Sequence, residues 1–247
     1  MTALPIPVQP LAQVVKEKPK PVNRLIDTSA TYLRTIYNVA EDGLITRRAR
    51  ISERLGLAGP TVSQTVIRLQ RDGFLVDSSI ERHLELTPEG HAIATAVTRK
   101  HRLAERMLCD LLGVPALRVH AEASKWEHVM SDDAERGLLG LLDHPTESPW
   151  GNPIPGLGEL GVDYRPRPPA TRLIDIGRPP RPVVATVRSI SEDAQADDDL
   201  MRRLVDSGII PGARIRIEYR DTTYTLRGLN AIDIPAKKGH IIRVDHE

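Results

Sequence analysis

Apolar residues in the first third of the chain recur at helical spacing in three successive segments. The first helix is predicted to begin at Asp27 or Thr28, both typical N-cap residues, and to stop before Gly43. "RRARISERLG" predicts a short second helix that ends at Gly56, and "GPTVSQTVIRLQRDG" predicts a third with proline in its first turn. "FLVDSSIERHLELT" alternates like two short strands around a turn. This order predicts a winged helix-turn-helix.

The middle of the chain is also predicted to be helical. "TPEG" offers Thr87 as the N-cap of a long helix that runs to about Leu112. A second helix follows from about Ala116 to Met130, and "DDAERGLLGLLDHP" predicts a third. Leucines on several sides of these short helices favour a surface that is buried against a second copy of the chain. A compact monomeric bundle is the alternative.

The last third changes to strand-like patterns. The stretch "YRPRPPATRLIDIGRPPRP" is rich in proline and arginine, which predicts a semi-rigid linker. The segments "PVVATVRSI", "ARIRIEYR", "TYTLRG" and "GHIIRVDHE" are typical of strands, and "DDDLMRRLVDSG" predicts one helix between them. Together they favour a small β-barrel.

Composition narrows the class of protein. The 247 residues, 40% hydrophobic and 27% charged, are typical of a globular chain with two or three small domains. Cys109 is the only cysteine, which excludes a disulfide within the chain and a thiolate zinc cluster. Without a long apolar run or a signal peptide, a cytoplasmic protein with no membrane partner is expected. Because the net charge is only +1, DNA binding would need a local patch.

One such patch surrounds the predicted third helix. Short hydroxyl and amide side chains near a helix N-terminus can approach base edges, and flanking arginines can neutralise phosphates. A surface helix whose polar residues are merely solvated is the alternative. The candidate DNA-binding residues are Arg48, Arg50, Pro60, Thr61, Ser63, Gln64, Thr65 and Arg68.

Histidine and glutamate recur in the first two helices of the middle region. His101 and Glu105 are four residues apart, so both project from one helix face, and His120 on the next helix could bind the same ion. Imidazole and carboxylate without thiolate suit Fe(II), Mn(II), Co(II), Ni(II) or Zn(II). For each histidine taken alone, a buried structural role is the alternative.

A second group of polar donors lies in "HAEASKWEHVM" and the serine that follows it. On one continuous helix, His120, Ser124, Glu127, His128 and Ser131 would form a single stripe of nitrogen and oxygen donors. Glu127 and His128 could form a second metal site with a group from another helix. Exposed Glu and His residues that bind nothing are the alternative.

Several strings together resemble one known family. "YLRTIY", "RARISERL", "GPTVSQTV", "RDG", "RKHRLAER", "WEHVMSD" and "GNPIPGL", spread over residues 25–162, are similar to the diphtheria toxin repressor and iron-dependent regulator family of metal-activated transcriptional repressors. The resemblance implies a homodimer that binds a palindromic operator once a divalent metal, Fe(II) in the iron-responsive branch, fills sites between the DNA-binding and dimerisation domains. It also implies a C-terminal SH3-like barrel.

The resemblance implies an ancillary metal site at His101, Glu105 and His120. The family completes this site with an acidic residue and a glutamine from the SH3-like domain. Those positions are expected at Asp197 and Leu200, so an amide ligand is expected to be missing.

The resemblance also implies a primary site at Glu127 and His128, whose sulfur donors fall on Thr31 and Ser124. Hydroxyls are harder and weaker ligands than thioether sulfur, so this site should lose affinity for softer ions. Altered selectivity toward Mn(II), or loss of metal dependence, is the alternative function.

The expected fold class is mainly α with small β parts: an N-terminal winged helix-turn-helix, a helical dimerisation domain and a C-terminal SH3-like β-barrel. The expected domains are a flexible N-terminal tail (1–23), a winged-helix DNA-binding domain (24–97), a helical dimerisation and metal-binding domain (98–162), a Pro-rich linker (163–182) and an SH3-like domain (183–247).

A metallohydrolase could use the same histidine and glutamate donors. No nucleophile or general-base motif accompanies them, and the ligand helices directly follow a DNA-binding domain. We therefore expect no enzyme and no small-molecule substrate. The expected partners are double-stranded operator DNA and a second copy of the chain.

Overall fold

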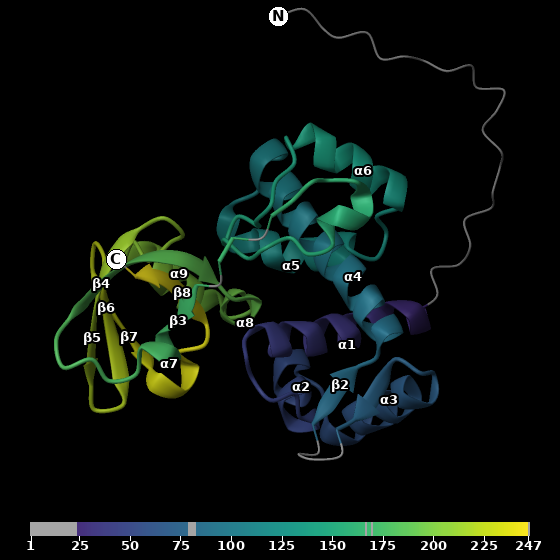
Figure 1. The fold of residues 1–247 in the computed structure, drawn as a ribbon, viewed down its shortest axis with the longest axis horizontal. Helices are drawn as coiled ribbons and strands as arrows, with labels where there is room; N and C mark the ends of the chain where they lie inside the picture. The colour runs from purple at the N-terminus through teal and green to yellow at the C-terminus, as the bar shows by residue number, and fades with distance from the viewer. Residues whose placement is uncertain (1–23, 79–82, 166, 169, 247) are drawn as a thin grey trace, which may run out of the picture.

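The computed structural model describes residues 24–78, 83–165, 167–168 and 170–246, with only the backbone for 24–27. Figure 1 shows two helical parts and a C-terminal β part that follow one another along the chain. The expected tail over residues 1–23 lies outside the described residues. No helix in the described part of the chain is long and apolar enough to cross a membrane.

The first part is the winged helix-turn-helix that the sequence predicts. Leu33, Ile51 and Val66, one from each helix, belong to a single core that also includes the two strands. The second helix ends at Gly56, whose φ of 62° is a left-handed conformation that glycine adopts without steric cost. The elements are α1 (Arg24–Glu41), α2 (Arg48–Leu55), α3 (Gly59–Arg71), β1 (Leu75–Asp77) and β2 (Leu84–Leu86).

The second part is built around one long helix that leaves the winged helix (Figure 1). Thr87 caps this helix, and its hydroxyl accepts a hydrogen bond of 3.1 Å from the amide of Gly90. The last turn is π-helical, where a plain α-helix is predicted. The elements are α4 (Pro88–Arg106), η2 (Met107–Leu111), α5 (Ala116–Trp126), α6 (Asp132–Leu141) and η3 (Leu157–Leu160).

The helix α5 ends at Trp126, four residues before its predicted end at Met130. The amide of Met130 donates to the carbonyl of Trp126, and the chain turns there. Ser131 then caps α6 by accepting from the amide of Ala134, so the intervening residues must form the connection between two helices. The predicted continuous stripe is therefore wrong, and Glu127 follows the helix instead of lying within it.

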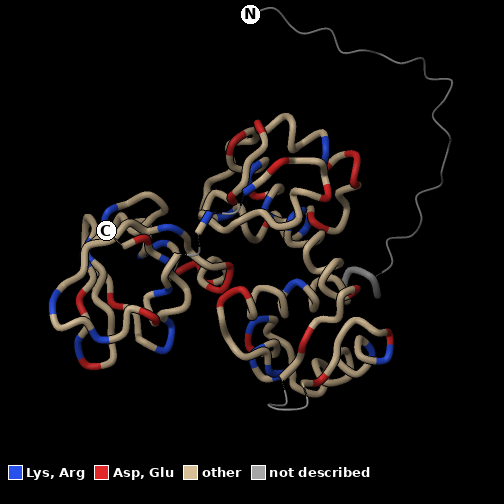
Figure 2. The backbone as a smooth tube through the Cα atoms, viewed as in Figure 1, with Lys and Arg blue, Asp and Glu red and all other residues tan. Residues whose placement is uncertain are grey.

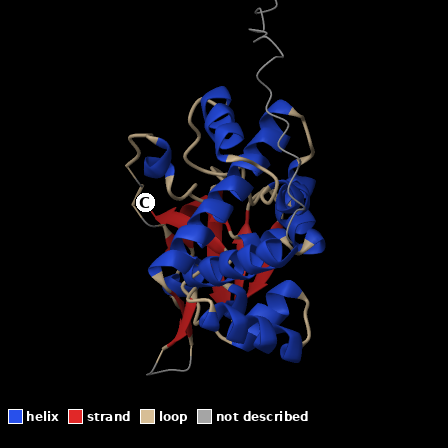
Figure 3. Cartoon of the chain, turned by 90° about the vertical axis from the view of Figure 1, so that its right-hand side faces the viewer, coloured by secondary structure: helices blue, strands red, loops and turns tan. Residues whose placement is uncertain are grey.

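The C-terminal part contains a six-stranded antiparallel sheet in the order β3-β8-β4-β5-β6-β7. In Figure 3, the helices of the first two parts stand in front of these strands. The four predicted strands and the predicted helix are confirmed. The elements are β3 (Thr171–Arg172), α7 (Leu173–Ile176), β4 (Val183–Ile190), α8 (Glu192–Gln195), α9 (Asp198–Asp206), β5 (Arg214–Arg220), β6 (Thr223–Arg227), β7 (Ala231–Pro235), η4 (Ala236–Lys238) and β8 (Ile242–His246).

Five of these elements, β3, α7, α8, β7 and η4, are not predicted by the sequence patterns. β3 and α7 lie within the predicted linker, so that part of the linker is structured. β7 is the edge strand that pairs with β6. The four-residue helix α8, between β4 and α9, is too short to show a helical period, yet it carries Glu192 of the candidate metal centre described below.

The C-terminal part contacts both others. Trp150, from the loop after α6, lies in the core of the β part and is only 4% exposed. Arg54 of α2 pairs with Asp193 at 3.2 Å, and Arg172 donates to the carbonyl of Asp42 at 2.7 Å. Lys, Arg, Asp and Glu are spread over all three parts (Figure 2). An ion pair and a hydrogen bond thus help to hold the β part against α2 and the turn before it.

Candidate metal centre

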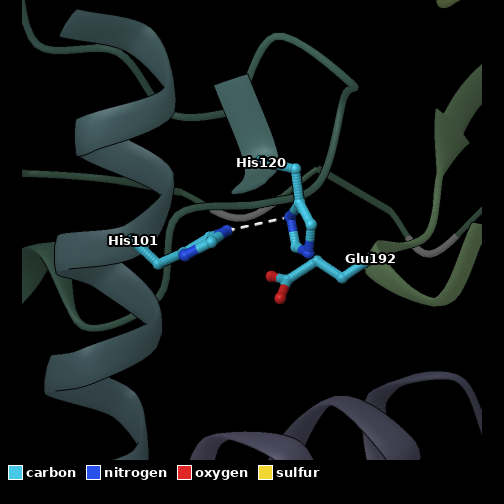
Figure 4. A group of neighbouring side chains, drawn as sticks. All are labelled: His101, His120 and Glu192. Carbon is cyan, nitrogen blue, oxygen red and sulfur yellow. Dashed lines mark hydrogen bonds between the residues drawn. The ribbon is translucent and has the colours of Figure 1, made fainter. Parts of the chain in front are cut away.

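Three side chains from three different elements converge at the junction of the domains. His101 of α4, His120 of α5 and Glu192 of α8 each offer a ligand atom within 4.8 Å of the others (Figure 4). His101 Nε2 lies 3.0 Å from His120 Nδ1. Glu105 Oε1 lies 3.1 Å from His101 Nε2 and 3.0 Å from His120 Nδ1. The structure thus brings together the three residues expected at one site and adds Glu192.

Asp197, the acidic ligand expected from the sequence, has a different position. Its carboxylate accepts a hydrogen bond of 3.0 Å from the amide of Leu200 and caps α9. Leu200 itself is buried in the core of the β part. The acidic side chain that lies beside the two histidines is Glu192, which belongs to the short helix α8. Asp197 follows five residues later, at the start of α9.

The helix α8 also carries an amide that the sequence reading missed. Gln195 is buried, and its Nε2 donates to the carbonyl of Ile190 at 2.8 Å. Its Oε1 is buried without a hydrogen-bond partner among the described residues. The expectation of a missing amide rested on Leu200, whereas "EDAQ" places glutamate and glutamine three residues apart on one turn of helix.

The buried charges of this cluster balance one another. Burial and the charge of Arg34 lower the pKa of His101, but the carboxylates of Glu192 and Glu105 outweigh them and raise it to about 9. Burial raises the pKa of Glu105, but the charge of His101 and its hydrogen bonds lower it to about 2. The pKa of Glu192 lies well below its usual range because Arg102 and Arg34 outweigh burial. At neutral pH the cluster therefore holds a protonated His101 between carboxylates.

The cluster fits a divalent cation. Glu105 Oε2 is buried without a hydrogen-bond partner among the described residues, a position that costs free energy unless a further ligand reaches it. The donors are imidazole nitrogens and carboxylate oxygens, which suit divalent first-row metals. A cation here would take the place of the proton on His101 and satisfy the orphaned oxygen.

A second group of donors lies where α1 meets the end of α5. Thr31 Oγ1 and Glu127 Oε1 lie 3.2 and 3.3 Å from His128 Nε2. Glu127 Oε2 lies 2.6 Å from His101 Nδ1. The structure brings Thr31, Glu127 and His128 together, whereas the hydroxyl of Ser124 donates to the carbonyl of His120 at 3.2 Å. One carboxylate therefore touches residues of both candidate sites.

Arg34 of α1 joins the two sites and is absent from the sequence-based candidates. Its Nη1 lies 2.6 Å from Glu192 Oε2, and its Nε lies 3.2 Å from Glu127 Oε1. The second contact is an ion pair without hydrogen-bond alignment. The sequence contains one indication of this position. Arg34 follows Thr31 by three residues, so both side chains lie on the same side of α1.

The candidate base-reading residues of α3 differ in their exposure. Pro60, Thr61 and Gln64 are exposed, whereas Ser63 and Thr65 are half-buried. The buried side consists of Val62, Val66 and Leu69. The exposed residues are therefore accessible to the base edges in a DNA major groove.

The candidate arginines around α3 have different surroundings. Arg48 lies 3.6 Å from Asp77 of β1, and Arg50 donates to the carbonyl of Ile45 at 3.2 Å. Arg68 is half-buried and lies 3.4 Å from the hydroxyl of Ser29 in α1. Arg48 therefore lies beside the wing, Arg50 contacts the loop between α1 and α2, and Arg68 lies toward α1.

A winged helix-turn-helix whose first helix reaches a buried imidazole and carboxylate centre is typical of a metal-responsive DNA-binding regulator. Comparison with protein families supports this class. Residues 24–84 match the model of the iron dependent repressor N-terminal DNA binding domain, and residues 87–156 match that of the iron dependent repressor metal binding and dimerisation domain.

Individual relatives extend the similarity over most of the chain. The iron-dependent repressor IdeR of Mycobacterium tuberculosis is 48% identical over 229 residues, which cover 91% of this chain and 99% of the relative. The diphtheria toxin repressor of Corynebacterium diphtheriae is 46% identical over 224 residues, 90% of this chain and 98% of the relative. The structure of a manganese-dependent transcriptional repressor in complex with manganese has a TM-score of 0.72 at 26% identity, covering 89% and 100% of the two chains.

The chain belongs to the iron-dependent repressor family. It is a metal-dependent DNA-binding transcriptional repressor and not an enzyme.

Proposed function

We propose that the chain is an iron-responsive repressor that binds a palindromic operator as a homodimer when Fe(II) fills two sites. His101, Glu105, His120 and Glu192 form one site, and Gln195 is available to complete it. Thr31, Glu127 and His128 form the other, with Ser124 as an additional candidate. The observation that carries the proposal is the meeting of side chains from α1, α4, α5 and α8 at one buried junction.

The mechanism follows from where the ligands are attached. A bound divalent cation supplies positive charge at the junction. Thr31 and Arg34 belong to the first helix of the winged domain, whereas Glu127 and Glu192 belong to the other two parts. Holding Thr31 to Glu127 therefore fixes the winged domain relative to the dimerisation domain. Metal binding favours the domain arrangement that holds the metal more tightly. If DNA selects the same arrangement, DNA binding must in turn tighten metal binding.

Homodimer formation fits the surface of the helical part. Large apolar side chains remain exposed at the C-terminal ends of its helices, and apolar side chains that are covered by a second copy of the chain are typical of a homodimer interface. These residues are Leu111, Leu112, Trp126, Val129 and Leu141. Two winged domains related by twofold symmetry would match a palindromic operator.

The test is DNA binding by chelator-stripped protein, titrated under anaerobic conditions with Fe(II), Mn(II) or Zn(II). The probe is a pool of random duplexes, from which bound sequences are recovered and then used singly. Enrichment of a palindrome that depends on metal is the expected result. Enrichment that is as strong without metal would refute the metal-responsive mechanism, and the order of the metal midpoints would reveal the preferred ion.

Two variants test the ligand assignment. Glu192→Gln should raise the metal concentration needed for DNA binding by about tenfold or more, because a charged ligand is lost. Asp197→Asn is the matched control, since Asp197 caps α9 and should leave the metal midpoint unchanged. The reverse result would return the acidic ligand to Asp197.

A further inference from the structure

The exposed side of α3 carries a stripe that includes one apolar residue. Pro60, Gln64, Ile67 and Arg71 follow one another at intervals of four, three and four residues, so they line one face of the helix. The buried residues of α3 lie on the opposite face. Ile67 thus lies between the amide of Gln64 and the guanidinium of Arg71 on the face turned away from the core.

Ile67 does not belong to the core that the described residues of the winged domain form. It is 60% exposed, more than any other large apolar residue described in the winged domain. The core side of the helix is already filled by Val62, Val66 and Leu69. A β-branched side chain also has a lower helix propensity than alanine or a charged residue at the same exposed position. Its place in the stripe, rather than exposure alone, distinguishes it from a scattered surface residue.

The chemistry of the major groove offers one apolar feature to such a side chain. Thymine presents its 5-methyl group there, and apolar side chains on a recognition helix contact this methyl group. Gln64 can pair with an adenine edge through its amide, and Arg71 carries the charge that a phosphate or guanine requires. An isoleucine between them is suited to neither hydrogen bonding nor charge neutralisation.

We propose that Ile67 determines sequence specificity by packing against the 5-methyl group of a thymine in the operator, next to the base pair that Gln64 contacts. The inference rests on the proposed function, because it requires α3 to enter the major groove. It adds an apolar contact to the hydroxyl and amide contacts expected from the sequence.

The experiment uses the full chain, loaded with Fe(II) or Mn(II), and the best single duplex recovered from the random pool. Each thymine of the half-site is replaced in turn by deoxyuridine, which removes only the methyl group. One replacement should weaken binding of the wild type by about three- to tenfold, the value of one buried methyl contact. The same replacement should have no effect on Ile67→Ala, whereas Ile67→Val should retain part of it.

Leu229→Ala is the matched control, because Leu229 is an 84% exposed apolar residue in the turn between β6 and β7. It should retain the full effect of deoxyuridine. Thermal unfolding of Ile67→Ala should match the wild type, since the removed atoms are mostly exposed.

The outcomes separate the inference from the proposed function. A palindrome whose binding is insensitive to every deoxyuridine, or equally sensitive in wild type and Ile67→Ala, would overturn only the role of Ile67. Failure of the metal-loaded wild type to enrich any sequence would overturn the proposed function, and the role of Ile67 with it.

Discussion

Replacing Arg34 by methionine should weaken the metal-free protein far more than the metal-loaded protein. The guanidinium is the cation that lies between Glu127 and Glu192, with contacts of 3.2 and 2.6 Å and only 10% exposure of its side chain. If these carboxylates also bind metal, the metal competes with Arg34 for them. Arg34 would then neutralise both sites in the metal-free state.

The magnitude follows from the remaining contacts. Removing one partner of a buried ion pair typically costs about 3–5 kcal/mol. Glu192 retains Arg102 at 3.0 Å and Glu127 retains His101 at 2.6 Å, so we expect the lower end of this range, about 3 kcal/mol, without metal. With metal bound, the carboxylates gain a divalent partner, and we expect about 1 kcal/mol. The difference of about 2 kcal/mol corresponds to metal binding about 30-fold tighter in Arg34→Met.

The assay is thermal unfolding with and without saturating Mn(II), together with direct metal titration. For a chain of this length, 1 kcal/mol shifts Tm by about 2–4 °C, so Tm should fall by about 6–12 °C without metal and by about 2–4 °C with it. Lys125→Met is the control. Its 2.6 Å pair with Glu122 is exposed, and its loss should change Tm little in either state.

Equal losses of Tm in the two states would refute the reasoning, because Arg34 would then support the fold without competing with metal. Weaker metal binding by Arg34→Met would have the same consequence. It would mean that the guanidinium orients the carboxylates for the cation.

Three further predictions concern the pH dependence, the hydroxyl ligands and the DNA-reading helix. Because the pKa of His101 is raised from 6.5 to about 9, its stabilising contribution to the metal-free protein is complete below about pH 6.5 and is lost as the pH rises through 9. Metal binding at pH 7.5 should therefore release about one proton. Calorimetry in buffers of different ionisation enthalpy measures this number, and proton release that persists unchanged above pH 10 would contradict the prediction. The double variant Thr31→Met, Ser124→Cys should bind Fe(II) and Ni(II) more tightly in DNA-binding titrations, and an unchanged midpoint would mean that these residues are not ligands. Gln64→Ala should weaken binding to the enriched duplex by about 1–3 kcal/mol, with little effect on binding to random DNA. Arg50→Ala should weaken binding to both DNAs and reduce the salt slope by about 1. Equal losses on both DNAs for Gln64→Ala would exclude a role of Gln64 in base readout.

Local periodicity is sufficient to predict the winged helix and the pairing of two residues, His101 and Glu105, in the candidate metal centre. Val62, Val66 and Leu69 recur at helical spacing, and the structure buries all three on one side of α3. His101 and Glu105 are four residues apart, so their shared face follows from helix geometry alone. These features depend only on residues that are close together in the sequence, so they can be predicted without knowing the fold.

The residues that the sequence reading missed depend on contacts between distant segments. Glu192 lies in a helix too short for a periodic signal, and it meets His101 only because the β part is docked against α4 and α5. Arg34 resembles an ordinary surface arginine until two carboxylates from other domains surround it.

Trp150 belongs to the core of the C-terminal part although it precedes that part in the chain. Its indole fills the core of the sheet, yet it belongs to the loop after α6, before the predicted linker. A fragment cut at the predicted boundary, residue 183, would leave a hole where this large aromatic side chain was, and loss of a buried tryptophan costs about 3–5 kcal/mol. A residue of the preceding segment therefore forms part of the core of the sheet. If domains were exchanged between relatives, stability would be preserved only if this loop were transferred together with the sheet.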